Sequence, residues 1–571
     1  MPIEIKVPFL GQNVDKGTIS QWLKSEGQDV NSDDVLVEIE AEKAVIEVES
    51  PANGNLASIV VSEGSLVKPG EILGYIAEPG ESFTKPEKSA PSQIETVEET
   101  APAQQVEMES EPPWIAVIGG GPGGYTAAIK AAQRGAKVTL IEKAKLGGTC
   151  LHTGCMPTKA YLAKAKVMEQ LAGSKIFEGS QGVKLDIKQL MNSKDQAVDK
   201  LTNGIKSLMK SNRIEVFEGS AQFADEKRVQ IHPDQGASFE IDPDETIIAA
   251  GSVPMEIPGV AVDGKLIHNT DTIWKMEKVP RKLLVAGSGA VGVEFACIYN
   301  ALGASVTLVE MLDIAMPGLD REVADTLAKS LINRGIELLT ATAIQEATIK
   351  GQKVRASLSQ EGQETVKEFD CVLVACGRRP EINGLDLDKT GIQTDRGAVT
   401  VGPDMRTNIP HIYAIGDIIG PPMLAHAAFY EAEVAVGNIF GGSLRADYNK
   451  IPYCVYSFPE VGSVGLTEEQ AQEALTNYKT ARFPFYANGK AMVCGETEGM
   501  VKLIFDEDLG EILGVHIVGE HATELVANVT TAISAELTID ELAGTIMAHP
   551  TLSEAMAEAA QAALGHALHL P

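Results

Sequence analysis

Residues 114–124 read Trp-Ile-Ala-Val-Ile-Gly-Gly-Gly-Pro-Gly-Gly, an apolar run that leads directly into a glycine-rich turn. We expect a buried strand, then a helical stretch to about Arg134, and then a second strand over 137–141 that ends at Glu142. Glycines in such a turn let the backbone approach a pyrophosphate at the helix N-terminus, and the acidic residue accepts a hydrogen bond from a ribose hydroxyl. The pattern predicts a dinucleotide site that includes Glu142 and the glycines Gly119, Gly121 and Gly124.

The same pattern occurs a second time further along the chain. Residues 282–286 are an apolar strand that runs into Gly-Ser-Gly-Ala-Val-Gly, and a strand over 305–309 ends at Glu310. Two such units predict two bound dinucleotides and an α/β architecture. A carboxylate at Glu310 would repel a 2′-phosphate, and no arginine stands beside it to accept one. The second dinucleotide is therefore expected to be NAD, bound at Glu310 and at the glycines Gly287, Gly289 and Gly292.

A pair of cysteines lies between these two units, in the sequence Gly-Gly-Thr-Cys-Leu-His-Thr-Gly-Cys-Met-Pro-Thr-Lys over residues 147–159. Cys150 and Cys155 can lie one helical turn apart and form a disulfide with little movement of the backbone. The alternative is a chance pair of buried thiols, because cysteine is among the most buried residue types. The flanking Gly-Gly turn, Pro157 and Lys159 favour a two-electron redox switch.

Length, charge and cysteine content limit the classes of protein. A chain of 571 residues has room for roughly four domains. Its seven cysteines do not form a secreted disulfide framework, and Cys371 and Cys376, in or beside an apolar run, are expected to be inert core thiols. No apolar run has the length of a membrane span, and no secretory or organelle signal is visible, so we expect a cytoplasmic protein. The net charge of −31 argues against nucleic-acid and anionic-membrane partners; it suits a basic protein partner or solubility alone.

Residues 1–80 contain an internal repeat with an offset of 37 residues, at which Ser25-Glu26-Gly27 recurs as Ser62-Glu63-Gly64. Two similar halves of short alternating strands predict a small all-β sandwich with pseudo-two-fold symmetry. Between the halves, Lys43 stands in a Glu-Lys-Ala sequence at an expected hairpin tip. This region resembles a lipoyl domain, in which that lysine carries lipoic acid. An ordinary surface lysine is the alternative, whereas a biotinyl domain usually places its lysine between methionines.

A second feature of the N-terminal region is its connection to the rest of the chain. Residues 81–112 consist largely of Pro, Ala, Ser, Gln and Glu, with hardly an aromatic residue. This composition cannot bury enough apolar area to offset the entropy lost on ordering. We therefore expect a flexible, acidic linker that tethers the lipoyl domain.

The stretch around the two cysteines resembles the signature G-G-T-C-x4-C-x-P-x-K of the pyridine-nucleotide disulfide oxidoreductases. Its one departure is His152, where the family usually carries Asn. The resemblance implies that Cys150 and Cys155 form a redox-active disulfide and that the first dinucleotide site holds FAD. It also implies an ion pair between Lys159 and Glu294 near the flavin ring.

Two further stretches are similar to FAD signatures of this family. Residues 246–252 read Thr-Ile-Ile-Ala-Ala-Gly-Ser, with Ala250 in place of the usual Thr. Residues 407–417 read Thr-Asn-Ile-Pro-His-Ile-Tyr-Ala-Ile-Gly-Asp, and the family uses their last residue to contact the ribityl region of FAD. By resemblance, the FAD residues are Gly119, Gly121, Gly124, Glu142, Lys159, Gly251 and Asp417, and the NAD residues are Gly287, Gly289, Gly292, Glu294, Glu310 and Gly377.

Residues 549–554 read His-Pro-Thr-Leu-Ser-Glu and match the H-P-T-x-x-E motif of the same family. The resemblance makes His549 the acid/base and Glu554 the residue that orients it, both reaching across a dimer interface into the partner's active site. A homodimer is therefore expected. Residues 551–554 are also a possible capping box for the closing helix, and this interpretation stays open.

The resemblance implies a multidomain protein, with a small all-β lipoyl sandwich followed by an α/β flavoprotein with two dinucleotide-binding domains and an α+β dimerisation domain. The expected boundaries are 1–80 for the lipoyl domain, 81–112 for the linker, 113–261 and 383–450 for the FAD-binding parts, 262–382 for the NAD-binding domain and 451–571 for the dimerisation domain.

The implied reaction is the oxidation of protein-bound dihydrolipoyl groups to lipoyl groups, with reduction of NAD to NADH and no metal. The implied setting is a 2-oxo acid, acetoin or glycine-cleavage system, with a lipoylated acyltransferase or another component as partner. One alternative is a glutathione-type or mercuric reductase, which Glu310 and a C-terminus without an extra cysteine pair disfavour. The other is a lipoyl carrier or scaffold with an inactive core, against which the intact set of Cys150, Cys155, His549 and Glu554 argues.

Overall fold

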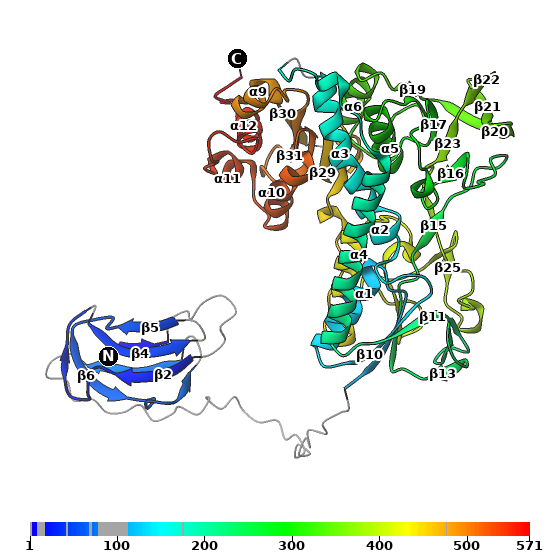
Figure 1. Cartoon of the computed structure of the whole chain (residues 1–571). Helices are drawn as coiled ribbons and strands as arrows, with labels where there is room; N and C mark the ends of the chain where they lie inside the picture. Colours follow the sequence, from blue (N-terminus) through cyan, green and yellow to red (C-terminus); the bar gives the residue numbers. More distant parts are fainter. Residues whose placement is uncertain are drawn as a thin grey trace. The chain divides into compact units, whose positions relative to one another are not determined.

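The structure is a computed structural model that describes residues 3–7, 17–32, 34–41, 44–67, 71–77, 112–173, 176–474 and 477–570. The chain divides into two units, Met1–Glu109 and Ser110–Pro571. Figure 1 shows both units, coloured along the sequence, and each is described by itself.

The first unit is a sandwich of two four-stranded sheets. One sheet has the order β1 (Ile3–Lys6), β8 (Ile72–Ala77), β6 (Gly54–Ile59) and β3 (Asp29–Val30), and the other has the order β5 (Ala44–Glu49), β4 (Val35–Ala41), β2 (Gly17–Trp22) and β7 (Leu66–Val67). Strands β2, β3 and β4 recur as β6, β7 and β8, which confirms the predicted repeat. Because β3 pairs with β6 and β2 pairs with β7, the halves exchange strands and share one core, with Leu36, Ile39, Leu56 and Leu73 fully buried.

The strands on either side of the predicted lipoyl lysine are paired with each other. Strands β4 and β5 pair antiparallel up to Ala41 and Ala44. Lys43 itself lies outside the described residues, and so do residues 78–111, which make up nearly all of the predicted linker. The attachment of lipoate to Lys43 and the flexibility of the linker therefore stay predictions.

The second unit begins with a seven-stranded sheet that carries the first glycine-rich turn. Its order is β13 (Phe239–Ile241), β12 (Val229–Pro233), β11 (Glu215–Phe223), β10 (Lys137–Glu142), β9 (Trp114–Ile118), β14 (Glu245–Ile248) and β27 (Ile412–Ala414). The five strands from β11 to β27 are parallel, so both faces must be covered. Helices α1 (Pro122–Gln133) and α7 (Ala425–Ile439) pack on one face through alanines such as Ala128 and Ala432.

A second parallel sheet carries the second glycine-rich turn. Its five strands have the order β16 (Ile267–Asn269), β23 (Cys371–Val374), β17 (Lys282–Ala286), β18 (Ser305–Val309) and β19 (Glu337–Leu339). Helices α5 (Ala290–Ala301) and α6 (Arg321–Asn333) follow β17 and β18. An antiparallel sheet of β20 (Thr342–Lys350), β21 (Lys353–Gln360) and β22 (Gln363–Phe369) packs against the strands of the parallel sheet. The chain enters and leaves this domain through the paired strands β15 (Ser252–Pro254) and β24 (Arg378–Pro380).

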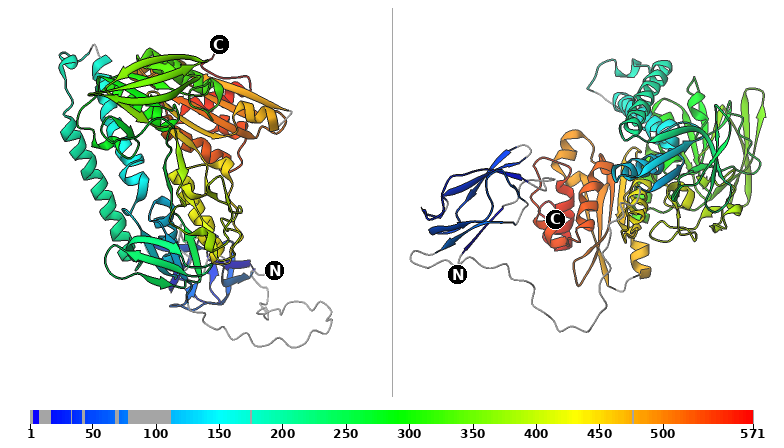
Figure 2. Two further views of the ribbon diagram at one scale, coloured as in Figure 1. Left: turned by 90° about the vertical axis from the view of Figure 1, so that its right-hand side faces the viewer. Right: turned by 90° about the horizontal axis from the view of Figure 1, so that it is seen from below.

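The C-terminal domain is α+β. Its antiparallel sheet has the order β28 (Tyr453–Val455), β29 (Glu460–Gly465), β32 (Ile512–Gly519), β31 (Met500–Asp506) and β30 (Tyr478–Pro484). Helices α10 (Ala522–Ser534), α11 (Ile539–Gly544) and α12 (Glu554–Ala563) pack on it through a buried apolar cluster that includes Val529, Leu542 and Met556. Two short helices, α8 (Glu468–Ala474) and α9 (Gly489–Cys494), complete the domain. Figure 2 shows this domain, in orange and red, against the green domain that carries the second glycine-rich turn.

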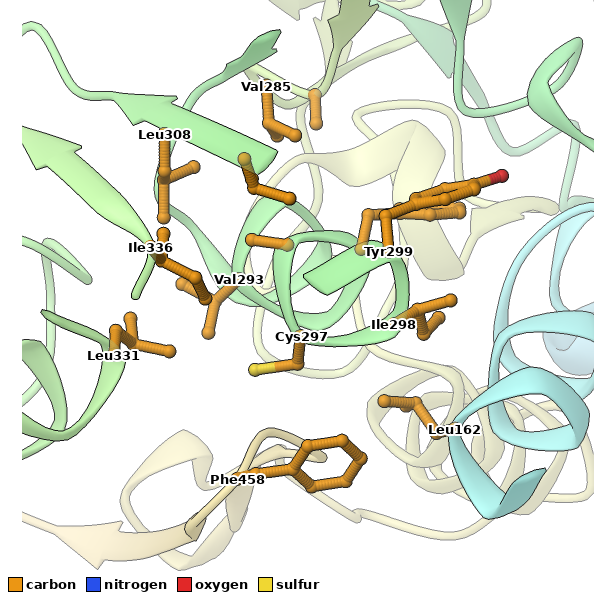
Figure 3. Close-up of a cluster of buried hydrophobic side chains, with 14 of the residues drawn as sticks. Leu162, Val285, Val293, Cys297, Ile298, Tyr299, Leu308, Leu331, Ile336 and Phe458 are labelled. Atoms are coloured by element: carbon orange, nitrogen blue, oxygen red, sulfur yellow. The ribbon is translucent and has the colours of Figure 1, made fainter. Parts of the chain in front are cut away.

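Helix α5 lies at the centre of a buried apolar cluster in which the domains of the second unit meet. Figure 3 shows its residues Val293 and Cys297 among side chains from three directions. Leu162 comes from α3 (Cys155–Gly173), Leu308 from β18, and Phe458 from the segment that joins β28 to β29. This shared core holds the two dinucleotide-binding domains and the C-terminal domain in one fixed arrangement.

Two long helices run along one another in the second unit, α3 and α4 (Ile187–Ser211) (Figures 1 and 2). Asp186 is the N-cap of helix α4, and its carboxylate accepts from the backbone N–H groups of Lys188 and Gln189.

Among the described residues, no helix combines the length and the apolar character that a membrane crossing requires.

Candidate active site

The first glycine-rich turn has the geometry that a bound pyrophosphate requires. Gly119 has a φ of 107°, and a Cβ on it would lie 2.2 Å from the carbonyl oxygen of Ala249. A Cβ on Gly124 would lie 1.8 Å from the carbonyl oxygen of Gly119, so only glycine lets α1 start this close to β9. The open side of Gly121, whose Cβ would meet nothing closer than 4.0 Å, faces the site.

Glu142 at the end of β10 holds this turn from the other side. Its Oε2 accepts from the backbone N–H of Gly120 at 2.6 Å, and its Oε1 accepts from the N–H of Ala144 at 2.6 Å. The side chain is 8% exposed. Both oxygens are thus oriented by the backbone, and the carboxylate is presented beside the turn, where a ribose would bind.

The second turn repeats this geometry. Gly287 has a φ of 96°, and a Cβ on Gly292 would lie 1.9 Å from the carbonyl oxygen of Gly287. Gly289 has open space where its Cβ would be. Glu310 accepts at Oε2 from the N–H of Ser288 at 2.9 Å and at Oε1 from the N–H of Leu312 at 3.0 Å. The two turns are therefore equivalent supports for two dinucleotides.

Both turns open into one continuous cavity of about 3000 Å³. This volume is several times that of a site for one drug-sized ligand, which is on the order of 300–1,000 Å³. The residues predicted from the sequence that line it are Gly119, Gly121, Glu142, Cys150, Cys155, Lys159, Gly251, Gly287, Gly289, Glu294, Glu310, Gly377 and Asp417. Gly124 and Gly292 do not line the cavity. Each lets the helix of its turn approach the preceding strand closely, α1 to β9 and α5 to β17.

The two cysteines lie on either side of a helix break and not in one helix. Cys150 belongs to α2 (Gly148–His152), and Cys155 is the first residue of α3. The break occurs because the N–H groups of Thr153 and Gly154 both donate to the carbonyl oxygen of Thr149. The two thiols nevertheless lie within hydrogen-bonding distance of each other, across this break. Both residues are free thiols in this structure and line the cavity.

The two thiols have different acidities. The pKa of Cys155 is lowered to about 7, because the Cys150 thiol hydrogen-bonds to it and Lys159 lies nearby. The pKa of Cys150 is raised, because its proton is held by that hydrogen bond and its side chain is buried. Cys155 also begins helix α3, where the helix dipole favours a thiolate. The reduced site therefore carries its negative charge on Cys155.

Lys159 and Glu294 form the predicted ion pair. The Lys159 Nζ lies 3.0 Å from each carboxylate oxygen of Glu294. The same carboxylate accepts from the N–H of Tyr456 at 3.1 Å, and the Lys159 Nζ lies 4.2 Å from the centre of the Tyr456 ring. Glu294 is buried on α5, so the pair ties α3 to the domain of the second glycine-rich turn, beside the dithiol.

Arg378 connects several of these elements, although the sequence motif around it suggested no such role. Its guanidinium donates to Oγ of Ser252 at 2.8 Å and to Oγ1 of Thr149 at 3.3 Å. Ser252 in turn donates to Asp417 at 2.5 Å. Arg378 also lies 3.4 Å from Asp271. Asp417 is thereby coupled to the helix that carries Cys150. Of its partners, only Thr149 is local to the cysteine motif, so spacing alone could not have identified this network.

His549 and Glu554 form a pair, but they do not line this cavity. Nδ1 of His549 lies 2.8 Å from Oε1 of Glu554, and the His549 side chain is 76% exposed. Glu554 is the first residue of α12, where its Oε2 accepts from the N–H of Thr551 at 2.8 Å. This contact is the carboxylate half of the possible capping box; the hydroxyl half is not formed, because the N-cap is Ser553 and the Thr551 hydroxyl donates to the carbonyl oxygen of Ala548.

Two other predictions concern residues near the cavity. Cys371 is buried, as expected of a core thiol, but Cys376 is only partly buried and lines the cavity, because it follows β23 at the end that faces the site. His152, which replaces the usual Asn, lies 3.0 Å through its Nε2 from the carbonyl oxygen of Leu146. It thus closes the turn that precedes Cys150.

Comparison with known families agrees with this geometry. Residues 113–432 match the family described as pyridine nucleotide-disulphide oxidoreductase, and residues 451–560 match the dimerisation domain of the same family. Residues 3–76 match a family described as biotin-requiring enzyme, which covers biotin- and lipoyl-type domains. The fold class expected from the sequence is confirmed.

Individual relatives match most of the second unit's length. The dihydrolipoyl dehydrogenase of Zymomonas mobilis is 40% identical over 460 residues, which cover 80% of this chain and 98% of the relative. A dihydrolipoyl dehydrogenase of Bacillus subtilis is 37% identical over 459 residues, 80% of this chain and 99% of the relative. Among solved structures, LpdA from Mycobacterium tuberculosis has a TM-score of 0.74 at 27% identity and covers 79% of this chain and 99% of its own. The flavoprotein disulfide reductase RclA from Escherichia coli has a TM-score of 0.69 at 26% identity, with coverages of 78% and 99%.

Proposed function

The chain belongs to the pyridine nucleotide-disulphide oxidoreductase family, and we propose that within it the protein is a dihydrolipoyl dehydrogenase that oxidises dihydrolipoyl groups and reduces NAD. The observation that carries this proposal is the dithiol of Cys150 and Cys155, which lines one cavity together with two dinucleotide-binding turns. A lipoyl-type unit in the same chain and relatives that are dihydrolipoyl dehydrogenases support the choice of substrate.

The residues present fit FAD at the first turn and NAD at the second. The first turn is followed closely by the cysteine motif, so its dinucleotide lies nearer the dithiol along the chain. The open sides of Gly121 and Gly289 leave room for pyrophosphates, and Glu142 and Glu310 are placed to accept from the riboses. When bound, the flavin supplies two-electron exchange between the dithiol and the nicotinamide.

The thiol chemistry follows from the different acidities of the two cysteines. In the disulfide form, a thiolate of the dihydrolipoyl group attacks Sγ of Cys150, and the bond to Cys155 breaks. Cys155 leaves as the thiolate, which the nearby positive charge of Lys159 and the N-terminus of α3 stabilise. The second lipoyl thiolate then attacks the sulfur that is bound to Cys150, which releases the cyclic disulfide and leaves the two cysteines reduced.

This exchange oxidises the dithiol substrate by two electrons, and two protons must leave its thiols. A base is needed because the thiolate and not the thiol attacks. We assign that base to His549, oriented by Glu554 at 2.8 Å. His549 is exposed and does not line the cavity of its own chain. We infer that it serves the site of a second copy, which makes the enzyme a homodimer.

Subunit mixing tests this arrangement. A Cys150→Ser subunit keeps His549, and a His549→Gln subunit keeps its dithiol, so a heterodimer owns one intact site. Both variants should be nearly inactive alone, and mixing with subunit exchange should restore about one site in four. The absence of recovery after proven exchange would contradict a shared active site.

The choice of substrate is tested by two donors. We expect that the yellow protein loses colour on addition of reduced lipoamide and that reduced glutathione has no such effect. With NAD present, NADH should form with reduced lipoamide only. Activity with glutathione and NADPH would favour the glutathione-type alternative, and a colourless protein would favour an inactive scaffold. Cys150→Ser should abolish turnover but keep the flavin.

The lipoyl-type unit is proposed as a tethered substrate. We propose that Lys43 carries lipoate and that NADH alone reduces it, at a rate that does not depend on protein concentration, because a tether supplies an effective concentration of about millimolar. The partners would be a lipoylated acyltransferase or other components of a dehydrogenase complex. A variant that begins near Pro112 should keep full activity on free dihydrolipoamide. Unmodified Lys43 in protein from the native host would refute the tethered substrate and leave the dehydrogenase assignment standing.

A further inference from the structure

The two dinucleotide turns differ at the residue between their first two glycines. The first turn has Gly120, where a Cβ would lie 2.8 Å from Cδ1 of Leu146 and 3.2 Å from Oε2 of Glu142. The second turn has Ser288, which is fully buried. A hydroxyl group is therefore present in the second site at a position where the first site has no room for a side chain.

This hydroxyl makes two hydrogen bonds that join separate segments. It donates to Oε2 of Glu310 at 3.1 Å, the same oxygen that accepts from the Ser288 N–H at 2.9 Å. Its oxygen accepts from the backbone N–H of Met316 at 3.2 Å. Met316 is buried and has a φ of 56°, a conformation that is unusual for a residue other than glycine. Ser288 thus connects the glycine turn, the acidic residue and the segment after β18.

The segment after β18 forms a wall of the cavity. Met311, Pro317 and Gly318 all line it, close along the chain to Met316. The N–H of Leu312 donates to Oε1 of Glu310, so this segment also fixes the second carboxylate oxygen. Removing the hydroxyl would leave Glu310 with backbone donors only, as Glu142 has in the first turn, and would leave the Met316 N–H without this acceptor.

We propose that Ser288 is a positioning residue that sets the affinity and selectivity of the second site for an adenosine ribose with free hydroxyls. It acts by fixing Oε2 of Glu310 and the wall at Met316 together, so that the carboxylate meets ribose hydroxyls and repels a 2′-phosphate. The inference rests on the proposed function only in taking the second turn as the NAD site.

The test compares Ser288→Ala with the unmodified full-length, FAD-loaded protein. NADH binding is measured by equilibrium dialysis on protein whose disulfide and flavin have first been fully reduced, so that NADH is bound but not oxidised. NADH and NADPH are then compared in the reduction of the oxidised flavin. We expect the Kd for NADH to rise about tenfold, the change expected from the loss of one hydrogen bond to a charged group. The preference for NADH over NADPH should fall, whereas the FAD content and kcat at saturating NADH should not change.

Two controls separate positioning from a general structural role. Ser330→Ala removes another fully buried hydroxyl of the same domain, on α6, and should leave the Kd for NADH unchanged even if the melting temperature falls. In a double-mutant cycle, Glu310→Gln and Ser288→Ala should be less than additive on the Kd, because the serine acts through the carboxylate.

A Kd within twofold of the unmodified protein, or an additive cycle, would overturn the proposal. Neither the Kd for NADH nor the double-mutant cycle uses dihydrolipoamide. Both therefore stay valid tests even if dihydrolipoamide proves not to be the substrate. A protein that binds NADPH in place of NADH would refute the coenzyme assignment, and the selectivity of Ser288 with it.

Discussion

The turns at residues 119–124 and 287–292 have the same backbone geometry, and we propose a different coenzyme for each. In each, the first glycine has a positive φ, the third lies against the carbonyl oxygen of the first, and a buried glutamate accepts from the N–H between the first two glycines. The difference is one hydroxyl and its two partners at Ser288. The backbone thus provides a generic dinucleotide support, and under our proposal selectivity comes from single side chains added to it.

The strongest test of this equivalence places a methyl group on the third glycine of each turn. In Gly124→Ala and Gly292→Ala the new Cβ would lie 1.8 and 1.9 Å from a carbonyl oxygen, so the turn cannot keep its shape. Gly124→Ala should lose FAD, whereas Gly292→Ala should keep FAD and lose reduction by NADH by about a hundredfold or more. Flavin absorbance per chain and stopped-flow reduction measure the two effects.

The control is Gly204→Ala, within helix α4, where a Cβ would meet nothing within 4 Å. It should retain both FAD and NADH reduction. A Gly292→Ala protein with normal reduction by NADH would show that the second turn is not a coenzyme site.

The glutamates should give smaller, parallel effects. Glu142→Gln and Glu310→Gln each replace a charged acceptor by an amide whose NH2 can face the donating backbone N–H groups. We expect about a tenfold loss of affinity, for FAD in the first variant and for NADH in the second. Fluorescence titration of apoprotein with FAD and dialysis with NADH measure them. Glu364→Gln, at an exposed position, is the control. Loss of NADH affinity in Glu142→Gln and of FAD affinity in Glu310→Gln would reverse the two assignments.

A third variant makes the first turn resemble the second. In Gly120→Ser the added side chain would meet Leu146 and Glu142, so we expect a loss of about 1–3 kcal/mol in unfolding free energy. The cost of Gly120→Ser combined with Leu146→Ala should be smaller than the sum of the two single costs. Thermal unfolding with saturating FAD measures it, and strict additivity would contradict the packing argument.

The smallest effect concerns a third helix that begins at the cavity. Helix α3 begins with Cys155 and has no glycine-rich turn like the other two before it. Because the pKa of Cys155 is lowered to about 7, this residue is a thiolate above about pH 7 and a thiol below it. Lys159→Met removes a nearby positive charge, so the pKa of Cys155 should rise and the thiolate should be lost at a higher pH. Thiolate absorbance against pH measures the shift.

Lys164→Met, on the exposed face of the same helix, is the control and should leave the titration unchanged. An unchanged midpoint in Lys159→Met would show that the Cys150 hydrogen bond alone sets the acidity of Cys155.

The parts of the fold that depend on local pattern could be predicted from the sequence. The glycine turns, the strands on either side of them and the strand repeat of the first unit are all local, because φ, close approach and alternation are set within a few residues. The break between Cys150 and Cys155 was missed, because it depends on how Thr153 and Gly154 share one carbonyl acceptor.

Contacts between distant residues were predicted only where a family motif supplied them. Lys159 and Glu294 were paired by resemblance, and the structure contains the pair. The roles of Arg378, Tyr456 and Ser288 depend on contacts with segments far from each in the sequence, and no spacing rule indicates them. A cytoplasmic location and the lipoylation of Lys43 stay predictions.

The position of β27 has a consequence for the order in which the chain matures. Strand β27 pairs with β14 in the FAD-binding sheet, yet 163 residues, the whole NAD-binding domain among them, separate the end of β14 from its start. Domains generally fold as units, N-terminal first, while the chain emerges from the ribosome. The inserted NAD-binding domain is therefore complete before the sheet around it, and Asp417 arrives only after β27. Newly made chains would therefore form the proposed nicotinamide site first and bind flavin late in synthesis. Flavin absorbance would then report chains in which the proposed FAD-binding domain has folded around an NAD-binding domain that is already complete.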